Sequence, residues 1–232
     1  TAPCAAPMVA EQTGVNPFLL PFANQRVPDT DVLTDAQRAD AKRRLGWDDG
    51  RIHLTSFGYV DIRTKMADLV VESAAWLRQW GHPVTLHLAG KAQASLQAQL
   101  EERARKAGLE HFEITGFLTE EAFRDHLLAT DLGIQLRVSP LLGVSGPLSD
   151  LAAWGTPAVA STGLAIDVDT PGYVRRLPDE ASPVMVAEAV EAALGAPESL
   201  QNREAQRQAY LAAKSPQRYA EGLLAIVQDV LR

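Results

Sequence analysis

The sequence predicts an α/β protein with a doubly wound parallel sheet and helices on both faces. From Arg51 onward, short apolar runs of strand length alternate with longer amphipathic runs of helix length. Turn residues separate the two kinds of run at the spacing that is typical of β-α-β units. The chain has 232 residues, of which 46% are hydrophobic, enough to bury one good core.

The elements are expected in a regular order along the chain. Six apolar runs are predicted to be strands: Ile52–Phe57, Val84–Leu88, Phe112–Thr115, Leu132–Leu136, Ala158–Ala160 and Tyr173–Leu177. Five amphipathic runs are predicted to be helices: Lys65–Gln79, Ala92–Ala107, Glu120–Ala129, Gly146–Trp154 and Val184–Leu194. The tail from Pro197 to Arg232 predicts two more helices, which meet near Ser215.

Hydroxyl residues mark several helix starts, because a hydroxyl oxygen can accept a hydrogen bond from a free amide of the first turn. Thr34 and Thr119 are expected caps of this kind. Ser182 and Ser215 are each followed by proline, which suits the first helical turn.

The first 30 or so residues do not follow the alternation. Thr1–Val15 is rich in alanine and is predicted to be a helix, and Pro17–Pro21 is predicted to be a strand bounded by prolines. Ala23–Thr34 is expected to be a linker. A chain that opens in this irregular way is expected to be cut from a longer one.

Composition excludes several classes of protein. The formal net charge is -7 and there is no block rich in Lys and Arg, which argues against a nucleic-acid partner. The single cysteine, Cys4, excludes an intrachain disulfide framework and fits a reducing compartment. No apolar run approaches the roughly 18 residues that a membrane span needs, and no signal-peptide pattern opens the chain. We therefore expect a cytoplasmic protein with no transmembrane segment.

Metal and common cofactor motifs are not found in the sequence. The five histidines are scattered without the spacing of a ligand set, and each is expected to be a strand-end or surface residue: His53, His82, His87, His111 and His126. There is no GxSxG elbow, no GxxxxGK[ST] loop and no GxGxxG fingerprint. No metal site is therefore predicted, and any phosphate site must use another loop design.

Two loops at the predicted carboxyl ends of strands are candidate anion sites, because ligands of open α/β sheets bind there. The first runs from Gly58, which allows a sharp turn, to Arg63 and Lys65, whose charges can neutralise a diphosphate. A solvated turn with two ordinary surface cations explains the same residues. The second loop holds Arg137, followed by Ser145 and Gly146 at the start of a predicted helix.

Asp150 lies one turn into that second helix. Its carboxylate can accept hydrogen bonds from ribose hydroxyls. It can equally be a partner of the helix dipole, worth a few tenths of a kcal/mol. The residues alone leave both explanations open.

Four segments in order resemble the C-terminal, donor-binding domain of GT-B glycosyltransferases of the retaining family 4 type (glycosyl transferases group 1). They are LGWDDGRIHLTSFGYVDIRTK, VTLHLAGK, FEITGFLTEEAFRDHLLATDLGIQLR and SGPLSDLAAWGTPAVAS. The resemblance covers about residues 35 to 195, and the order of the four is more specific than any one of them. It implies a Rossmann-like fold that forms the C-terminal half of a GT-B architecture.

The resemblance also implies site residues for a nucleotide-sugar donor. Lys65 matches the diphosphate-binding lysine, and Asp150 stands at the position of the ribose-binding glutamate. Other matching positions line the base pocket or meet the sugar and phosphates, which gives the full expected donor site: Gly58, Arg63, Lys65, Gly116, Phe117, Leu118, Arg137, Gly143, Ser145, Gly146 and Asp150. No catalytic residue is assigned, and neither a cofactor nor a metal is expected.

Three departures from the family pattern concern catalysis more than fold. Tyr59 replaces the arginine that usually follows the glycine, Asp150 shortens the second glutamate, and Leu142 stands where the first glutamate would be. Leu136, Arg137, Ser145 and Gly146 instead satisfy the L-R-x(7)-S-G pattern of some bacterial members. A non-catalytic nucleotide- or sugar-binding module with a degenerate site is therefore the alternative to an enzyme, and an unrelated doubly wound binding domain is a third explanation.

The implied organisation has three parts. Residues 1–33 resemble the end of an N-terminal acceptor domain plus a linker, residues 34–214 the donor-binding domain, and residues 215–232 a terminal helix that packs back on the N-terminal domain. The expected partners are a nucleotide-sugar donor and an acceptor that is a glycan, a lipid or a small molecule. Because the acceptor domain is missing, this chain alone is expected to be inactive, and any peripheral membrane contact is expected to come through that domain.

Overall fold

The structure is a computed structural model, and it describes residues 2–23, 33–138 and 143–231. In this part of the chain, the sheet consists of six strands: β1 (Ile52–Phe57), β2 (Val84–Ala89), β3 (Phe112–Ile114), β4 (Leu132–Gln135), β5 (Ala158–Ser161) and β6 (Val174–Leu177). The strand order is β3-β2-β1-β4-β5-β6, and every pair is parallel. The predicted fold class is confirmed.

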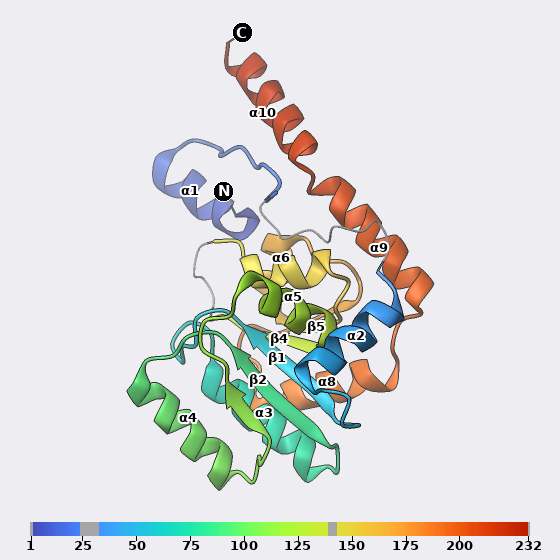
Figure 1. The fold of residues 1–232 in the computed structure, drawn as a ribbon. Helices are drawn as coiled ribbons and strands as arrows, with labels where there is room; N and C mark the ends of the chain where they lie inside the picture. Colours follow the sequence, from blue (N-terminus) through green and yellow to red (C-terminus); the bar gives the residue numbers. More distant parts are fainter. Residues whose placement is uncertain (1, 24–32, 139–142, 232) are drawn as a thin grey trace.

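Helices cover both faces of this sheet (Figure 1). On one face lie α3 (Ala67–Gln79), α4 (Ala94–Lys106) and α8 (Pro183–Gly195). On the other lie α2 (Asp35–Leu45), α5 (Glu120–Ala129), α6 (Gly146–Ala153), α7 (Thr162–Val168) and α9 (Leu200–Ala213). The 3₁₀-helix η1 (Pro3–Ala5) contacts α7 and leads into α1 (Ala6–Thr13), and α10 (Pro216–Val230) ends the described chain.

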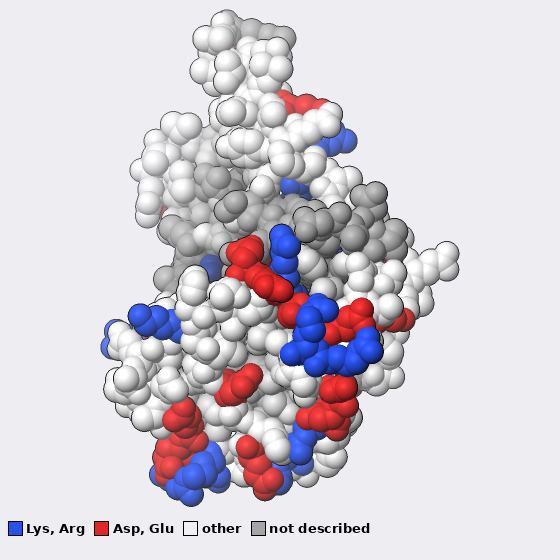
Figure 2. All heavy atoms as spheres, in the orientation of Figure 1, with Lys and Arg blue, Asp and Glu red and all other residues white. Residues whose placement is uncertain are grey.

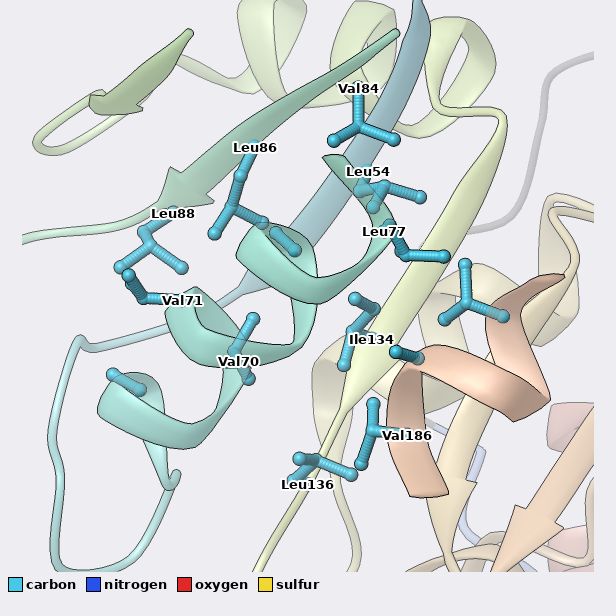
Figure 3. Packing of buried hydrophobic residues seen from close by; sticks show 14 of the residues in the cluster. Leu54, Val70, Val71, Leu77, Val84, Leu86, Leu88, Ile134, Leu136 and Val186 are labelled. Atoms are coloured by element: carbon cyan, nitrogen blue, oxygen red, sulfur yellow. The ribbon is translucent and has the colours of Figure 1, made fainter. Parts of the chain in front are cut away.

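The larger core lies between the sheet and α3 (Figure 3). In α3, apolar residues recur every three to four positions, so that Val70, Val71 and Leu77 share one buried face. They meet Leu54 and Leu86, which alternate along their strands with residues of the opposite face. Each fully buried leucine contributes roughly 1.5–3 kcal/mol. This packing fixes α3, and with it the loop that joins β1 to α3.

Side-chain caps confirm the predicted helix starts. Thr34 forms a capping box with Gln37, whose amide lies 3.3 Å from the Thr34 hydroxyl and whose side-chain oxygen accepts from the Thr34 amide. Thr119 caps α5 through the Ala122 amide. Two further hydroxyl caps precede proline-containing first turns, as predicted: Ser182 at α8 and Ser215 at α10.

The segment Pro17–Pro21 is not a strand, so this prediction was wrong. It has no regular structure, and Leu20 packs against Gly222 of α10 instead of pairing with the sheet. A proline at each end removes ladder donors, which leaves the segment unsuited to strand pairing. The predicted linker Ala23–Thr34 lies largely outside the described residues.

Helix α7 was not predicted. Its seven residues start directly after β5, with Gly163 in the first turn. Asp179 Oδ1 accepts from the Gly163 amide at 2.9 Å, and the Thr162 hydroxyl donates to the Leu177 carbonyl at 2.7 Å. Both partners lie near the end of β6, so tertiary contacts stabilise a helix that local periodicity does not announce.

Helix α10 projects from the body of the molecule (Figure 1), and Leu20, in the segment that follows α1, lies against its Gly222. Its apolar residues are largely exposed, with Leu224 and Val230 more than half accessible. No helix in the described part of the chain combines the length and apolarity of a membrane span. On the face drawn in Figure 2, Lys and Arg are interspersed with Asp and Glu around the sheet domain, and no broad basic patch appears there.

One close backbone contact gives a test of the fold. A Cβ added at Gly90 would lie 1.8 Å from the Gly58 carbonyl oxygen, so Gly90→Ala must push the two loops apart. We expect it to lower the free energy of unfolding by about 1–3 kcal/mol, the usual cost of overpacking. Urea denaturation checks this, with Gly195→Ala as control because nothing lies within 4 Å of its added Cβ. Equal stability of the two variants would contradict the contact.

Candidate functional site

The strand order reverses between β1 and β4, and this switch point positions the candidate site. From β1 the sheet continues through β2 to β3 on one side, and through β4 to β6 on the other. The connections that leave β1 and β4 therefore diverge, and ligands of doubly wound sheets bind in the crevice between them. The two loops predicted from sequence are the ones that follow these two strands.

The loop after β1 is folded closely onto the end of β2. Gly58 has φ 111°, a conformation that favours glycine, and its amide donates to the Ala89 carbonyl at 3.1 Å. Val60 continues the contact by donating to the Lys91 carbonyl at 3.0 Å. The loop is thus held by backbone bonds to the neighbouring strand exit.

A compact turn then presents Lys65. One carboxylate oxygen of Asp61 accepts from both the amide and the hydroxyl of Thr64, each at 2.6 Å, and the Thr64 bond in particular lowers the Asp61 pKa. Met66 has φ 52°, a left-handed conformation that is unfavourable for a residue with a side chain. Strained residues of this kind often mark functional sites, and here the strain directly precedes α3 and follows Lys65.

The chain that leaves β4 is tied to the same place. The Arg137 amide donates to Ser161 Oγ at 2.9 Å, and its guanidinium donates to the Gly143 carbonyl at 2.7 Å. The next amide, that of Val138, donates to the Thr64 carbonyl at 3.3 Å. The two predicted loops therefore share a direct backbone hydrogen bond.

Lys65 and Arg137 form a pair of neighbouring, partly buried cations. The Lys65 pKa is lowered to about 8, mainly by burial and secondly by the positive charge of Arg137. The negative charge of Asp61 acts in the opposite direction. Burial also lowers the Arg137 pKa. Among the described residues, neither cation forms an ion pair with a carboxylate. The fields of Asp61 and Asp167 offset part of the cost of these two charges, and a bound anion would lower that cost further.

The start of α6 lies next to Lys65. Not all of the backbone amides of its first turn are available to a ligand. Pro147 lies 3.4 Å from where a Cβ of Gly58 would be, and the Lys65 ammonium lies 3.6 Å from the same point. Proline has no amide hydrogen, and Ser145 Oγ accepts from the Leu148 amide at 3.2 Å. Ser145 is fully buried and its hydroxyl caps the helix, and Gly146 begins the first turn.

Asp150 lies deeper than the sequence suggested. It is 1% exposed, and its charge acts on Tyr210 of α9, where burial first and this carboxylate second raise the tyrosine pKa to about 12. The charges that shift the Lys65 pKa are those of Arg137 and Asp61, and Asp150 is not among them. The assignment of Asp150 to a ribose stays a prediction.

The remaining predicted residues lie around this centre. Arg63 is exposed and helps to lower the Asp61 pKa. In the β3–α5 loop, Gly116 has φ 73°, Leu118 packs in the core, and Phe117 is 90% exposed, free to stack on a flat ligand. Leu142 lies outside the described residues. Within those residues, no group of three or more His, Cys, Asp and Glu side chains could hold a metal ion.

Solved structures with the same fold identify this architecture. The C-terminal domain of a glycosyl transferase group 1 protein, LpcC from Francisella tularensis, superposes with a TM-score of 0.62 at 15% identity, covering 81% of this chain and 94% of that one. The chain has the fold of a GT-B glycosyltransferase C-terminal domain. This agrees with the family resemblance of the four sequence segments.

Longer neighbours share the GT-B fold over part of their length. HepE from Anabaena, solved with UDP and glucose, matches at a TM-score of 0.67 and 17% identity over 89% of this chain and 55% of its own. Sucrose-phosphate synthase from Thermosynechococcus elongatus matches at 0.75 and 14% identity over 100% of this chain and 57% of its own. The chain thus spans little more than half of these neighbours. No family model and no curated protein matches by sequence.

Sequence reasoning missed several residues that build the site. Thr64 and Asp61 form the turn before Lys65, and their D-x-x-T spacing was a usable local signal. Pro147 and Ser161 reach the site from α6 and β5. Their roles depend on strand order, which no local pattern reveals.

The cost of burying Lys65 gives a second prediction. Because its folded pKa is about 8, below its ordinary value of 10.5, the charged form is disfavoured in the fold. Lys65→Met should raise the free energy of unfolding by about 1–3 kcal/mol at pH 7. The gain should shrink as the pH rises from 8 to 10.5, where the folded lysine deprotonates before the unfolded one.

Chemical denaturation at several pH values measures this difference. Lys106→Met is the control, because Lys106 is exposed on α4 and pairs with Glu102 at the surface. A loss of stability in Lys65→Met at pH 7 would contradict the electrostatic strain.

Proposed function

We propose that the chain is the donor-binding half of a retaining glycosyltransferase, which transfers a sugar from a nucleotide-diphosphate sugar to a glycan, lipid or small-molecule acceptor. The observation that supports it best is the Lys65–Arg137 cation pair at the switch point of the sheet. A diphosphate would neutralise the mutual repulsion and the unpaired charge together. The GT-B fold and the UDP complex of HepE support the same ligand class.

The proposed roles follow from position. Lys65 and Arg137 bind the diphosphate and stabilise the charge that develops on it as the glycosidic bond breaks. Gly58 and Gly146 let the backbone approach the phosphates, and the exposed Phe117 stacks on the base. Acceptor contacts and any general base would come from a further domain, because this chain covers 55% to 58% of its longer neighbours.

A non-catalytic nucleotide-binding module is the second candidate. Two observations favour it: Tyr59 occupies an exposed position where the family pattern has a cation, and the Ser145 cap occupies an amide at the start of α6. Such a module would bind the nucleotide through the same cation pair without chemistry. In both cases the isolated chain should show no transfer or hydrolysis above background, and turnover at an ordinary enzyme rate would contradict the need for a second domain.

Calorimetric titration with UDP, GDP, ADP and TDP tests the ligand class. We expect one nucleotide to bind in the micromolar range, with at least a tenfold loss in Lys65→Ala and in Asp150→Ala, while Lys106→Ala binds like the unsubstituted chain. Absence of binding by all four nucleotides would overturn the donor site. Full binding by Asp150→Ala alone would remove only its ribose role.

The pH dependence of the same titration tests the cation pair. A bound diphosphate should raise the Lys65 pKa, so the chain should take up a proton on binding near pH 8, where free Lys65 is about half protonated. The affinity should then fall as the pH rises through about 8. Titrations in buffers of different ionisation enthalpy measure the uptake, which should be absent in Lys65→Met.

A further inference from the structure

A second polar cluster lies on the sheet face opposite α3, among α2, α5 and the first three strands. Trp47 stacks on His53 with ring centroids 4.6 Å apart and on His87 at 3.9 Å, and it meets the edge of His126 at 5.0 Å. Both His53 and His87 are 2% exposed. Sequence reasoning expected strand-end or surface histidines, and the fold instead buries three of them around one indole.

A continuous chain of hydrogen bonds runs through the two buried imidazoles. Asp49 Oδ1 lies 3.0 Å from His53 Nε2, and His53 Nδ1 lies 3.0 Å from His87 Nε2. His87 Nδ1 lies 2.6 Å from Glu113 Oε1. The chain therefore joins the α2–β1 connection to β1, β2 and β3, and it begins and ends on carboxylates that reach solvent.

Counting protons fixes the charge of this chain. Three hydrogen bonds need three protons, whereas two neutral imidazoles supply only two. The third proton does not reside on the carboxylates. The hydrogen bond from His87 lowers the Glu113 pKa, and bonds from the Arg51 amide and His53 lower the Asp49 pKa overall although burial raises it. The count of three hydrogen bonds is met when the imidazole pair carries one extra proton.

The environment of His53 decides which ring nitrogens donate in the proposed arrangement. Burial lowers the His53 pKa, and the charge of His87 lowers it further against Asp49, so His53 stays neutral and accepts at Nδ1. His87 then donates at both ring nitrogens, to His53 and to Glu113. Its cation also lies flat on the Trp47 ring, a favourable cation–π geometry.

Other charged groups around the pair are largely satisfied in separate contacts. Lys42 of α2 binds Asp131, which accepts from the His53 amide at 2.9 Å. Arg44 binds Asp125 of α5, and Arg51 lies 3.3 Å from Asp49. Burial lowers the pKa of His126, whose Nδ1 bonds to the Ala122 carbonyl. None of these groups donates a proton to the His53–His87 bond.

We propose that His53 and His87 form a one-proton latch, which holds the α2–β1 connection with Asp49 and Trp47 against β2 and β3 only while the pair shares one extra proton. A second proton would place two N–H groups face to face across 3.0 Å. Loss of the shared proton would leave one of the three bonds without hydrogen. The latch weakens in either direction.

The sign of the pH dependence follows from linkage. An unfolded histidine titrates near pH 6.5, so below that pH the unfolded chain binds two protons at these positions and the folded chain one. Stability therefore falls as the pH falls. Above about pH 6.5 the unfolded positions are neutral, so a latch that keeps its shared proton loses stability as the pH rises. The contribution of the pair peaks near the ordinary histidine pKa.

Nitrogen-15 NMR of the full chain tests the proton count directly. At pH 6.5 we expect ring shifts of one imidazolium and one neutral imidazole for His87 and His53, with a strongly downfield proton between them. Two neutral rings, or two imidazolium rings, at this pH would overturn the latch. The measurement uses the unsubstituted protein, so it does not depend on whether a variant folds.

Urea denaturation midpoints between pH 5 and 8.5 show which histidine causes the fall in stability at acid pH and which causes the fall at alkaline pH. His53→Gln should reduce the decline on the acid side, of which buried His126 keeps a share, and leave the decline on the alkaline side, whereas His87→Gln should mainly reduce the alkaline decline. His111→Gln is the matched control, because His111 is exposed outside the cluster, and it should keep both declines. Variants whose profiles both parallel that of the control would refute the assignment.

Discussion

The parallel pairing of β1 with β2 on one side and β4 on the other is the constraint on which the rest of the structure depends. β1 is buried on both faces, with Leu54 in the core beneath α3 and Phe57 in the core beneath α6. Its exit is thereby fixed between two neighbours, and the Gly58 loop has to turn within the space that they leave. The cation pair and the histidine chain both lie along these central strands, near opposite ends.

The fold was largely predictable from the sequence because its signals are local. Apolar runs of two lengths, with hydroxyl and proline caps, gave all six strands and the helices from α3 onward except α7. The exceptions have a common cause. Thr162 and Gly163 find their partners at the end of β6, and Leu20 finds its partner in α10, so these segments take their conformation from distant residues.

The site was predictable in composition but not in arrangement. Spacing and family resemblance selected Gly58, Lys65 and Arg137, because each stands at a fixed offset from a strand end. Their mutual repulsion, the cap formed by Ser145 and the depth of Asp150 depend on which strands are neighbours. The hydrogen-bonded histidines could not be predicted for the same reason, because His53 and His87 are 34 residues apart in the sequence and His87 and Glu113 are 26 apart.

The contact between Gly58 and Gly90 has a consequence for how this fold can vary. Two loops that begin on different strands share one backbone surface: Gly90 has no room for a side chain against the Gly58 carbonyl, and Gly58 has a φ of 111°, which favours glycine. A change of conformation in one loop must therefore be matched in the other. We therefore expect a transplanted β1–α3 loop to need a β2–α4 loop of matching backbone shape, although a helix separates the two loops in the sequence.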